Sequence, residues 1–102
     1  MIRVGVVGCG GMGNVHARQY RKMSDVESFA FDLDAEKLES FCETHQVTPT
    51  ASFEELLSKV DAVDICLPTD FHHQIALPTI ASGLHLLVEK PMARTAAECE
   101  EM

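Results

Sequence analysis

Basic residues are scarce in this sequence. The 102 residues include 8 Lys plus Arg against 16 Asp plus Glu, which gives a formal net charge of −8. This acidic balance repels phosphate backbones and anionic lipid at long range, so nucleic acid and membrane surfaces are not expected partners. Four of the eight basic residues and none of the acids lie within residues 1–22. The opening segment is therefore the one place where an anion would be favoured.

Paired cysteines and long apolar runs are also missing. The four cysteines are more than twenty residues apart and form no C-x-x-C pair: Cys9, Cys42, Cys66 and Cys99. This spacing argues against a zinc ribbon and against a redox motif, and we expect reduced thiols and no metal site. No stretch approaches the roughly 20 apolar residues of a membrane-spanning helix. A secretory signal is also not indicated, so a cytoplasmic location is expected.

The composition is otherwise ordinary for a globular protein. Hydrophobic residues make up 46% and charged residues 24% of the chain, which excludes disorder and collagen-like repeats. Because domains commonly span roughly 100–200 residues, the chain forms at most one domain. A complete two-domain enzyme is excluded.

Short β-branched runs alternate with amphipathic segments along the chain. The pattern predicts strands at 2–7, 26–32, 47–50, 62–67 and 84–88. Helices are expected between them and after the last, with capping residues at Asp34, Ser52 and Thr95. This alternation favours an α/β fold built on a doubly wound parallel sheet with right-handed crossovers.

Pro78 lies inside the helix that we expect from Phe71 to about Ser82. Proline lacks an N–H and its ring clashes with the preceding turn, at a cost of about 3 kcal/mol. We therefore expect a bend or a broken turn near Gln74. Gly83 suits the left-handed residue that ends such a helix.

The last expected helix begins at Ala96, close to the chain end at Met102. A doubly wound sheet of this kind usually has a sixth strand, which would follow that residue. We therefore expect residues 1–102 to form a single domain that is incomplete at its C-terminal end, with any second domain absent. The strand at 84–88 would then present an unpaired edge, and edge-to-edge self-association or marginal stability is the expected consequence.

A glycine-rich turn follows the first strand. The segment Gly8-Cys9-Gly10-Gly11-Met12-Gly13 fits G-x-G-x-x-G and opens the first helix, which is the context of a dinucleotide-binding loop. Gly8 permits the tight turn, Gly10 lets the backbone approach a pyrophosphate, and Gly13 lets the helix pack on the strand. Unpaired N–H groups of the helix would bind the anion. The alternative is a tight strand-to-helix turn without a ligand.

An acid stands where the ribose of such a cofactor is expected. Asp32 comes nineteen residues after Gly13, at the end of the second strand, and is placed to accept hydrogen bonds from the ribose hydroxyls. A 2′-phosphate would meet a second acid at Asp34, so NAD is favoured over NADP. Lys37 could reach a 2′-phosphate and weaken that preference. The alternative for Asp32 is an ordinary turn residue.

Two further segments follow the fourth and fifth strands, and the chain carries a family resemblance there. The run from Gly83 to Pro91, GLHLLVEKP, is similar to the G-x-H-V-L-x-E-K-P signature of the glucose–fructose oxidoreductase, inositol dehydrogenase and rhizopine-catabolism (Gfo/Idh/MocA) family, with Leu86 in place of Val. The segment from Leu67 to His72 resembles the family's T-P-N-x-x-H motif, but Leu67 replaces Thr and Thr69 replaces Asn. The resemblance covers essentially the whole chain.

The resemblance implies the N-terminal NAD(P)-binding domain of an oxidoreductase. It places Lys90 near the nicotinamide and the substrate hydroxyl, where the lysine helps the proton leave while hydride goes to the cofactor. His72 would be a hydrogen-bond partner at the nicotinamide end, with a plain surface histidine as the alternative. A surface lysine is the alternative for Lys90, and His73 and His85 are taken as structural. The residues expected to contact the cofactor are Gly8, Gly10, Gly11, Met12, Gly13, Asp32, Leu67, Pro68, Thr69, His72, Glu89, Lys90 and Pro91.

Two functions are consistent with these residues. The first is the cofactor-binding part of a dehydrogenase that acts on a secondary alcohol of a sugar, polyol or cyclitol. In this case the 102 residues alone are expected to be inactive. The second is a stand-alone NAD(H)-sensing module without catalysis, for which Glu89-Lys90-Pro91 has no evident use. A flavoprotein finds less support, since nothing else in the chain suits the larger FAD ring system.

Overall fold

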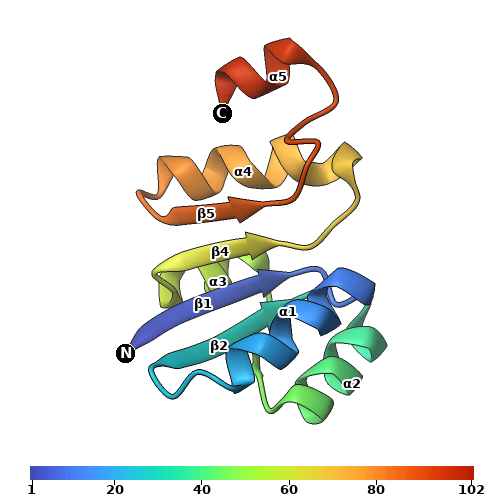
Figure 1. The fold of residues 1–102 in the computed structure, drawn as a ribbon, viewed down its shortest axis with the longest axis vertical. Helices are drawn as coiled ribbons and strands as arrows, with labels where there is room; N and C mark the ends of the chain where they lie inside the picture. Colours follow the sequence, from blue (N-terminus) through green and yellow to red (C-terminus); the bar gives the residue numbers. More distant parts are fainter.

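The computed structural model describes residues 1–102 and contains one five-stranded sheet (Figure 1). The strand order is β3-β2-β1-β4-β5, and every neighbouring pair is parallel. The strands are β1 (Ile2–Val7), β2 (Val26–Phe31), β3 (Thr48–Pro49), β4 (Ala62–Ile65) and β5 (His85–Val88). The order reverses direction at β1, which is the arrangement of a doubly wound sheet.

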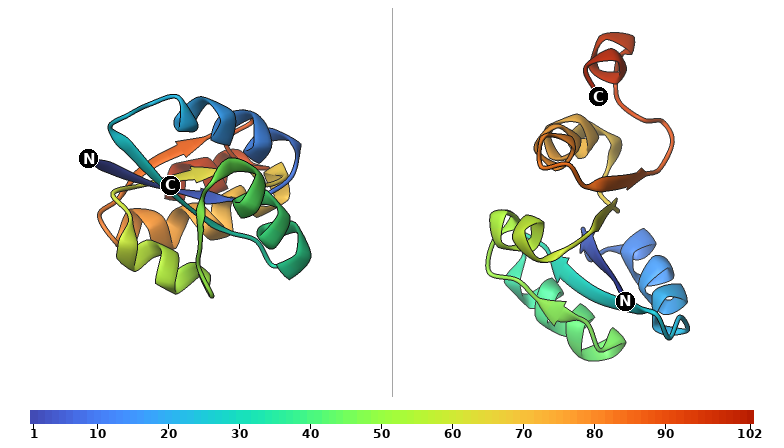
Figure 2. Two further views of the ribbon diagram at one scale, coloured as in Figure 1. Left: turned by 90° about the horizontal axis from the view of Figure 1, so that it is seen from below. Right: turned by 90° about the vertical axis from the view of Figure 1, so that its left-hand side faces the viewer.

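Helices cover both faces of the sheet. They are α1 (Gly11–Arg21), α2 (Ala35–His45), α3 (Phe53–Lys59), α4 (His72–Ala81) and α5 (Ala96–Glu101), with a 3₁₀ turn over Thr69–Phe71. In Figure 2, α1 and α3 lie on opposite sides of the sheet. The predicted Rossmann-like α/β fold is therefore confirmed. None of the helices combines the length and the apolar character that crossing a membrane would require.

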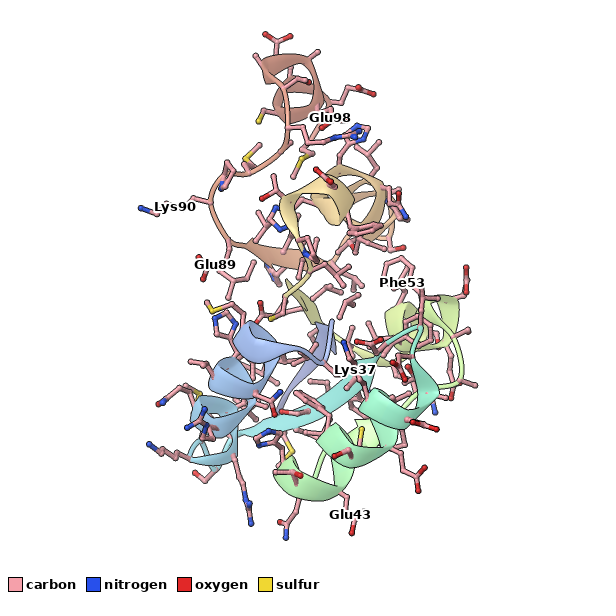
Figure 3. All side chains as sticks on the ribbon, turned by 90° about the vertical axis from the view of Figure 1, so that its right-hand side faces the viewer. Lys37, Glu43, Phe53, Glu89, Lys90 and Glu98 are labelled. Carbon is pink, nitrogen blue, oxygen red and sulfur yellow. The ribbon has the colours of Figure 1, made fainter.

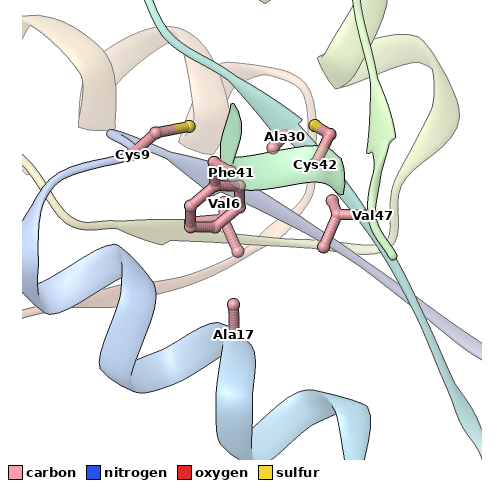
Figure 4. Packing of buried hydrophobic residues seen from close by; sticks show 7 residues of the cluster. All are labelled: Val6, Cys9, Ala17, Ala30, Phe41, Cys42 and Val47. Atoms are coloured by element: carbon pink, nitrogen blue, oxygen red, sulfur yellow. The ribbon is translucent and has the colours of Figure 1, made fainter. Parts of the chain in front are cut away.

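Two apolar clusters, one on each face, hold the layers together. Val6 packs among residues of α1 and α2 with Ala17, Phe41 and Cys42, as Figure 4 shows. The next residue of β1 turns to the other face, where a second cluster includes the fully buried Leu56 of α3. Full burial of a leucine side chain stabilises the folded state by about 1.5–3 kcal/mol. The alternation along β1 explains why this strand is apolar on both sides.

Three helices start at the predicted caps. Asp34 accepts hydrogen bonds from the backbone N–H groups of two first-turn residues, Ser52 accepts one from Glu55, and Thr95 accepts one from Glu98. At the Ser52 and Thr95 caps, the carboxylate of that glutamate also accepts a hydrogen bond from the backbone N–H of the residue before the cap, Ala51 or Arg94. Gly83 ends the α4 segment with φ 75°, as expected for a left-handed residue.

The expected broken turn near Gln74 does not occur. Helix α4 continues from His72 to Ala81 with Pro78 inside it, and the irregular turn lies earlier, at Thr69–Phe71. The missing N–H of Pro78 leaves the carbonyl of Gln74 without its helical donor. Gln74 is exposed, so water can reach that position and the helix tolerates the loss.

The two edges of the sheet differ. β3 contributes only two residues at one edge, whereas β5 forms the other edge with no strand beyond it. The α5 helix lies next to α4 at the far end of the molecule (Figure 1). The predicted position of β5 at an edge is confirmed, and self-association through it stays a prediction.

Candidate functional site

The candidate site lies at the carboxyl ends of the strands, which the register of the sheet brings level with one another. The final residues of four strands are aligned, because Val7 pairs with both Phe31 and Ile65, and Ile65 pairs with Val88. The residues that follow these strand ends therefore come together at one edge of the sheet, where ligands of doubly wound folds bind. They are Gly8, Asp32, Cys66 and Glu89. Four segments that are distant in sequence meet there.

The glycine loop is tightly folded at its two ends and open in the middle. Gly8 has φ 107°, and a Cβ there would lie 2.7 Å from the carbonyl oxygen of Cys66. A Cβ on Gly13 would lie 2.2 Å from the Gly8 carbonyl oxygen, whereas Gly10 and Gly11 have no atom within 4 Å of that position. Close backbone contacts thus require glycine at Gly8 and Gly13, whereas the space beside Gly10 and Gly11 is open for a ligand.

The N-terminus of α1 faces this free space. Gly10 is its N-cap and supplies no side chain to cap it, and no acid lies in its first turn. The first N–H groups of a helix have no partner within the helix, and they carry the positive end of its dipole. The opening turn at Gly11 and Met12, both exposed, is therefore suited to an anion.

Asp32 supports the same loop from the end of β2. One carboxylate oxygen accepts a hydrogen bond from the Cys9 N–H at 2.8 Å, and the other accepts one from the Asp34 N–H at 2.8 Å. Burial and the nearby Asp32 charge raise the pKa of Cys9 to about 12, so this thiol stays protonated. Each carboxylate oxygen retains further lone pairs, and the side chain is only half-buried. Asp32 is thus a turn residue and is also available to a ligand.

Three hollows follow one another along this edge. An apolar one of about 320 Å³ is lined by Leu33, Phe53 and Phe71, with Gly8 and Asp32 at its border. A middle one of about 420 Å³ lies over the glycine loop and includes Asp32 and Lys37. A third of about 310 Å³ is lined by Met12, Thr69, His72, Glu89 and Lys90, among others. Leu67 borders all three, so they form one continuous run.

The buried His72 side chain contacts the backbone of the segment that follows β4. This ring is only 2% exposed, so the alternative of a surface histidine is wrong. Nε2 faces the Leu67 carbonyl oxygen at 2.9 Å, and Nδ1 faces the carbonyl oxygens of Pro91 and Met92 at 3.1 and 3.3 Å. The ring therefore joins the loop after β4 to the loop after β5. Its expected contact with a cofactor stays a prediction.

Glu89 and Lys90 leave the end of β5 in different directions. Figure 3 shows Glu89 extending toward α1 and Lys90 extending away from the body of the molecule. Lys90 is exposed, and the peptide bond between Lys90 and Pro91 is cis. The lysine ammonium therefore stands free at the open rim of the third hollow.

A buried acid beside this hollow was not anticipated from the sequence. Asp64 of β4 is 1% exposed, and one of its carboxylate oxygens accepts hydrogen bonds from the Tyr20 hydroxyl and the His16 Nδ1–H, both at 2.6 Å. The Cys66 thiol approaches the other oxygen at 3.4 Å. Burial, followed by the nearby Asp64 carboxylate, raises the pKa of both Tyr20 and Cys66, so both remain donors. The sequence does contain one signal of this network, because Asp64 is an acid within an otherwise apolar strand.

His16, Asp64 and Cys66 also satisfy the spacing of a metal-ligand set. Their ligand atoms lie within 4.8 Å of one another, although the sequence predicted no metal site. His16 and Cys66 both direct donor groups at the Asp64 carboxylate. Without an ion, the same residues form a hydrogen-bond network that satisfies a buried carboxylate.

Comparisons with known proteins agree with this architecture. Residues 2–102 match the family described as "Oxidoreductase family, NAD-binding Rossmann fold". UDP-N-acetylglucosamine 3-dehydrogenase from Acidithiobacillus ferrooxidans is 33% identical over 101 residues, which are 99% of this chain and 32% of that protein. Its solved structure covers 97% of this chain and 31% of its own, with a TM-score of 0.87.

Two further solved structures contain nicotinamide cofactors. The WlbA dehydrogenase from Chromobacterium violaceum, in complex with NADH and UDP-GlcNAcA, is 29% identical with a TM-score of 0.90, covering 98% of this chain and 30% of its own. Biliverdin reductase from Synechocystis sp. PCC 6803, in complex with biliverdin and NADP⁺, is 26% identical with a TM-score of 0.89, covering 98% and 34%.

The chain spans about a quarter to a third of the length of the curated relatives it matches. The residues of this chain that match the family, 2–102, include the glycine loop, Asp32 and the Glu89-Lys90-Pro91 segment. The predicted resemblance is therefore confirmed: the chain belongs to the Gfo/Idh/MocA oxidoreductase family, and residues 2–102 are an NAD-binding Rossmann domain.

Proposed function

We propose that this chain is the cofactor-binding part of an NAD-dependent dehydrogenase that oxidises a secondary alcohol of a sugar, polyol or cyclitol. The observation that carries the proposal is the continuous run of three hollows at the carboxyl ends of the strands. An open glycine loop lies at its middle and a free lysine at one end. A sugar substrate is supported by the UDP-sugar dehydrogenases among the relatives.

The chemistry of the three hollows fits the parts of a dinucleotide in order. The apolar hollow between Leu33 and Phe71 suits an adenine ring, which packs well against apolar side chains. The middle hollow offers the N–H groups at the start of α1 to the pyrophosphate and Asp32 to the adenosine ribose. The third hollow then receives the nicotinamide end, next to Glu89 and Lys90.

The proposed preference for NAD over NADP rests on charge. Asp32 borders both the apolar and the middle hollow, and Asp34 follows it closely, so a 2′-phosphate would meet two carboxylates. Lys37 also lines the middle hollow and would offset part of that repulsion. We therefore expect NADH to bind more tightly than NADPH, with a difference that Lys37 reduces.

In the proposed mechanism the protein binds and orients the cofactor and the substrate, and Lys90 accepts the proton of the substrate hydroxyl. When bound, the nicotinamide would accept a hydride from the alcohol carbon. Lys90 Nζ would hold the substrate hydroxyl by a hydrogen bond and, in its neutral form, take the hydroxyl proton as the carbonyl forms. Because Lys90 is exposed at the rim, that proton can pass on to solvent.

A titration with NADH and NADPH, followed by nicotinamide fluorescence, tests the cofactor assignment. The chain contains no Trp, so protein emission does not interfere with the signal. Saturable binding that favours NADH is the expected result. Absence of binding by either nucleotide would contradict the proposal.

Lys90→Ala distinguishes the dehydrogenase from an NAD(H)-sensing module. In the longer protein that contains this domain, a dehydrogenase should lose NADH production from its alcohol substrate while still binding NADH. The matched control is Lys59→Ala, which changes an exposed lysine of α3 that pairs with Glu55. Unchanged turnover in Lys90→Ala would favour the sensor.

A further inference from the structure

We propose that His16 is a positioning residue that links the buried Asp64 to Glu89 and thereby fixes the carboxylate of Glu89 at the nicotinamide end of the site. The inference rests on the proposed function, because it assigns a role within the same cofactor site. His16 lies on α1, Asp64 on β4 and Glu89 at the end of β5. The three elements meet beside the third hollow.

The imidazole lies between two carboxylates. His16 Nδ1 is 2.6 Å from an Asp64 oxygen, and His16 Nε2 is 3.6 Å from Oε1 of Glu89. The His16 side chain is 17% exposed and that of Asp64 only 1%, whereas that of Glu89 is 45% exposed. One side of the ring is therefore anchored in the protein interior and the other points to the site.

The anchor is rigid because Asp64 is held by more than one donor. The Tyr20 hydroxyl donates to the same carboxylate oxygen as His16 at 2.6 Å, and both donors come from α1. A buried carboxylate without such partners would be strongly destabilising. The Asp64 network thus fixes the plane of the His16 ring and, with it, the direction of Nε2.

The consequence for the site concerns the two adjacent side chains of Glu89 and Lys90. When Glu89 is drawn toward His16, its carboxylate faces α1 and not the ammonium group of Lys90, as Figure 3 shows. Lys90 is left free for a substrate hydroxyl. Without His16, the Glu89 side chain would lose the polar group of α1 that faces it.

Amide substitutions can test the contact of His16 with Asp64 separately from its contact with Glu89. In His16→Asn the amide N–H₂ takes the place of Nδ1–H and can still donate to Asp64, but it cannot reach Glu89. We expect this variant to unfold at the same urea concentration as the wild type, and to bind NADH about three- to tenfold more weakly. Glu89→Gln should weaken NADH binding by a similar factor.

The double variant supplies the decisive comparison. If His16 acts through Glu89, then His16→Asn combined with Glu89→Gln should bind NADH no more weakly than either single variant. Independent, multiplying losses would overturn the inference. The matched control is His85→Gln, because His85 is an exposed histidine at the opposite end of β5, and it should leave NADH affinity unchanged.

A measurement without nucleotide separates this inference from the proposed function. The ring ¹⁵N resonances of His16 should shift in Glu89→Gln, with the larger change at Nε2, while those of His85 stay constant. If the wild type binds no nucleotide, the proposed function fails and the ring shift decides the His16–Glu89 link alone. Unchanged His16 resonances would overturn the link in either case.

Discussion

Substitution of Gly10 and Gly13 by alanine should separate the two tasks of the glycine loop. Both residues belong to the same motif and both changes add a single methyl group. At Gly10 the methyl enters open space, with no atom within 4 Å, whereas at Gly13 it lies 2.2 Å from the Gly8 carbonyl oxygen. The first change should therefore affect ligand binding and the second should affect folding.

The magnitude for Gly13→Ala follows from the closeness of that contact. The opposing atom is backbone at the end of β1, which is held by the Gly8 N–H bond to the Phe31 carbonyl oxygen at 3.0 Å, so neither partner can move freely. Overpacking of this kind typically costs 1–3 kcal/mol. We expect a loss of about 2–3 kcal/mol, which in a domain of this size lowers the melting temperature by roughly 10–20 °C.

Gly10→Ala should leave the stability almost unchanged. Alanine is a poorer N-cap than glycine, which costs up to about 1 kcal/mol, but it also reduces the conformational entropy of the unfolded chain, which returns about 0.4–1 kcal/mol. The methyl group would occupy the space proposed for the pyrophosphate. We expect at least a tenfold loss of NADH affinity, equivalent to about 1.4 kcal/mol.

Urea unfolding followed by far-UV circular dichroism, together with the NADH titration, measures both effects. The reasoning would be refuted if Gly13→Ala unfolded at the wild-type urea concentration. It would also be refuted if Gly10→Ala kept the wild-type NADH affinity while remaining folded. Gly83→Ala serves as a control for glycine loss far from the site, since its φ of 75° makes it destabilising without any effect on NADH.

Three other predictions follow from the same structure. Asp32→Asn should lower stability by about 1–2 kcal/mol, because one of two charge-assisted hydrogen bonds to backbone N–H groups is lost, and it should weaken NADH binding more than NADPH binding; equal losses for both nucleotides would contradict the ribose assignment. Burial, followed by Arg18 and Arg21, lowers the pKa of His45, so the unfolded state binds more protons than the folded state as the pH falls below about 6.5. The free energy of unfolding should therefore decrease as the pH is lowered through that range. His45→Gln should reduce this pH dependence in urea unfolding curves recorded between pH 5 and 7. Sedimentation equilibrium should show concentration-dependent association through the β5 edge, and Leu87→Lys, at a half-exposed position of β5, should suppress it; a wild-type monomer at every concentration would refute this.

Most of the fold could be predicted because its signals are local. The caps at Asp34, Ser52 and Thr95 and the left-handed Gly83 each act within a few residues, and all were found where expected. The second and fourth strands end earlier than predicted, at Phe31 and Ile65. The residues beyond these ends leave the sheet to form its carboxyl-end edge, and the apolar Cys66 and Leu67 do not reveal that turn.

The candidate site could be predicted only where it depends on a motif. The glycine loop and Asp32 are such cases. For Asp32 the pattern indicated a ligand role, with an ordinary turn residue as the alternative, but it did not reveal the hydrogen bond from the Cys9 N–H. The network around Asp64 depends on how α1 crosses β4, which joins residues 48 positions apart. His72 was placed correctly at a helix start, but its burial depends on the loop after β5 that covers it.

The hydrogen bonds of the loop bear on how it would bind a ligand. Gly8 is tied to β2 through its N–H, Cys9 is tied to Asp32, and Gly13 packs directly against the Gly8 carbonyl. The loop is therefore held in the conformation that we propose binds the nucleotide by contacts that involve no ligand. Ordering flexible segments on binding weakens affinity, and a preorganised site avoids that loss. Substitutions that loosen the loop, such as Asp32→Asn, should consequently weaken every nucleotide that uses it to some degree, and only the difference between NADH and NADPH reports on the ribose contact itself.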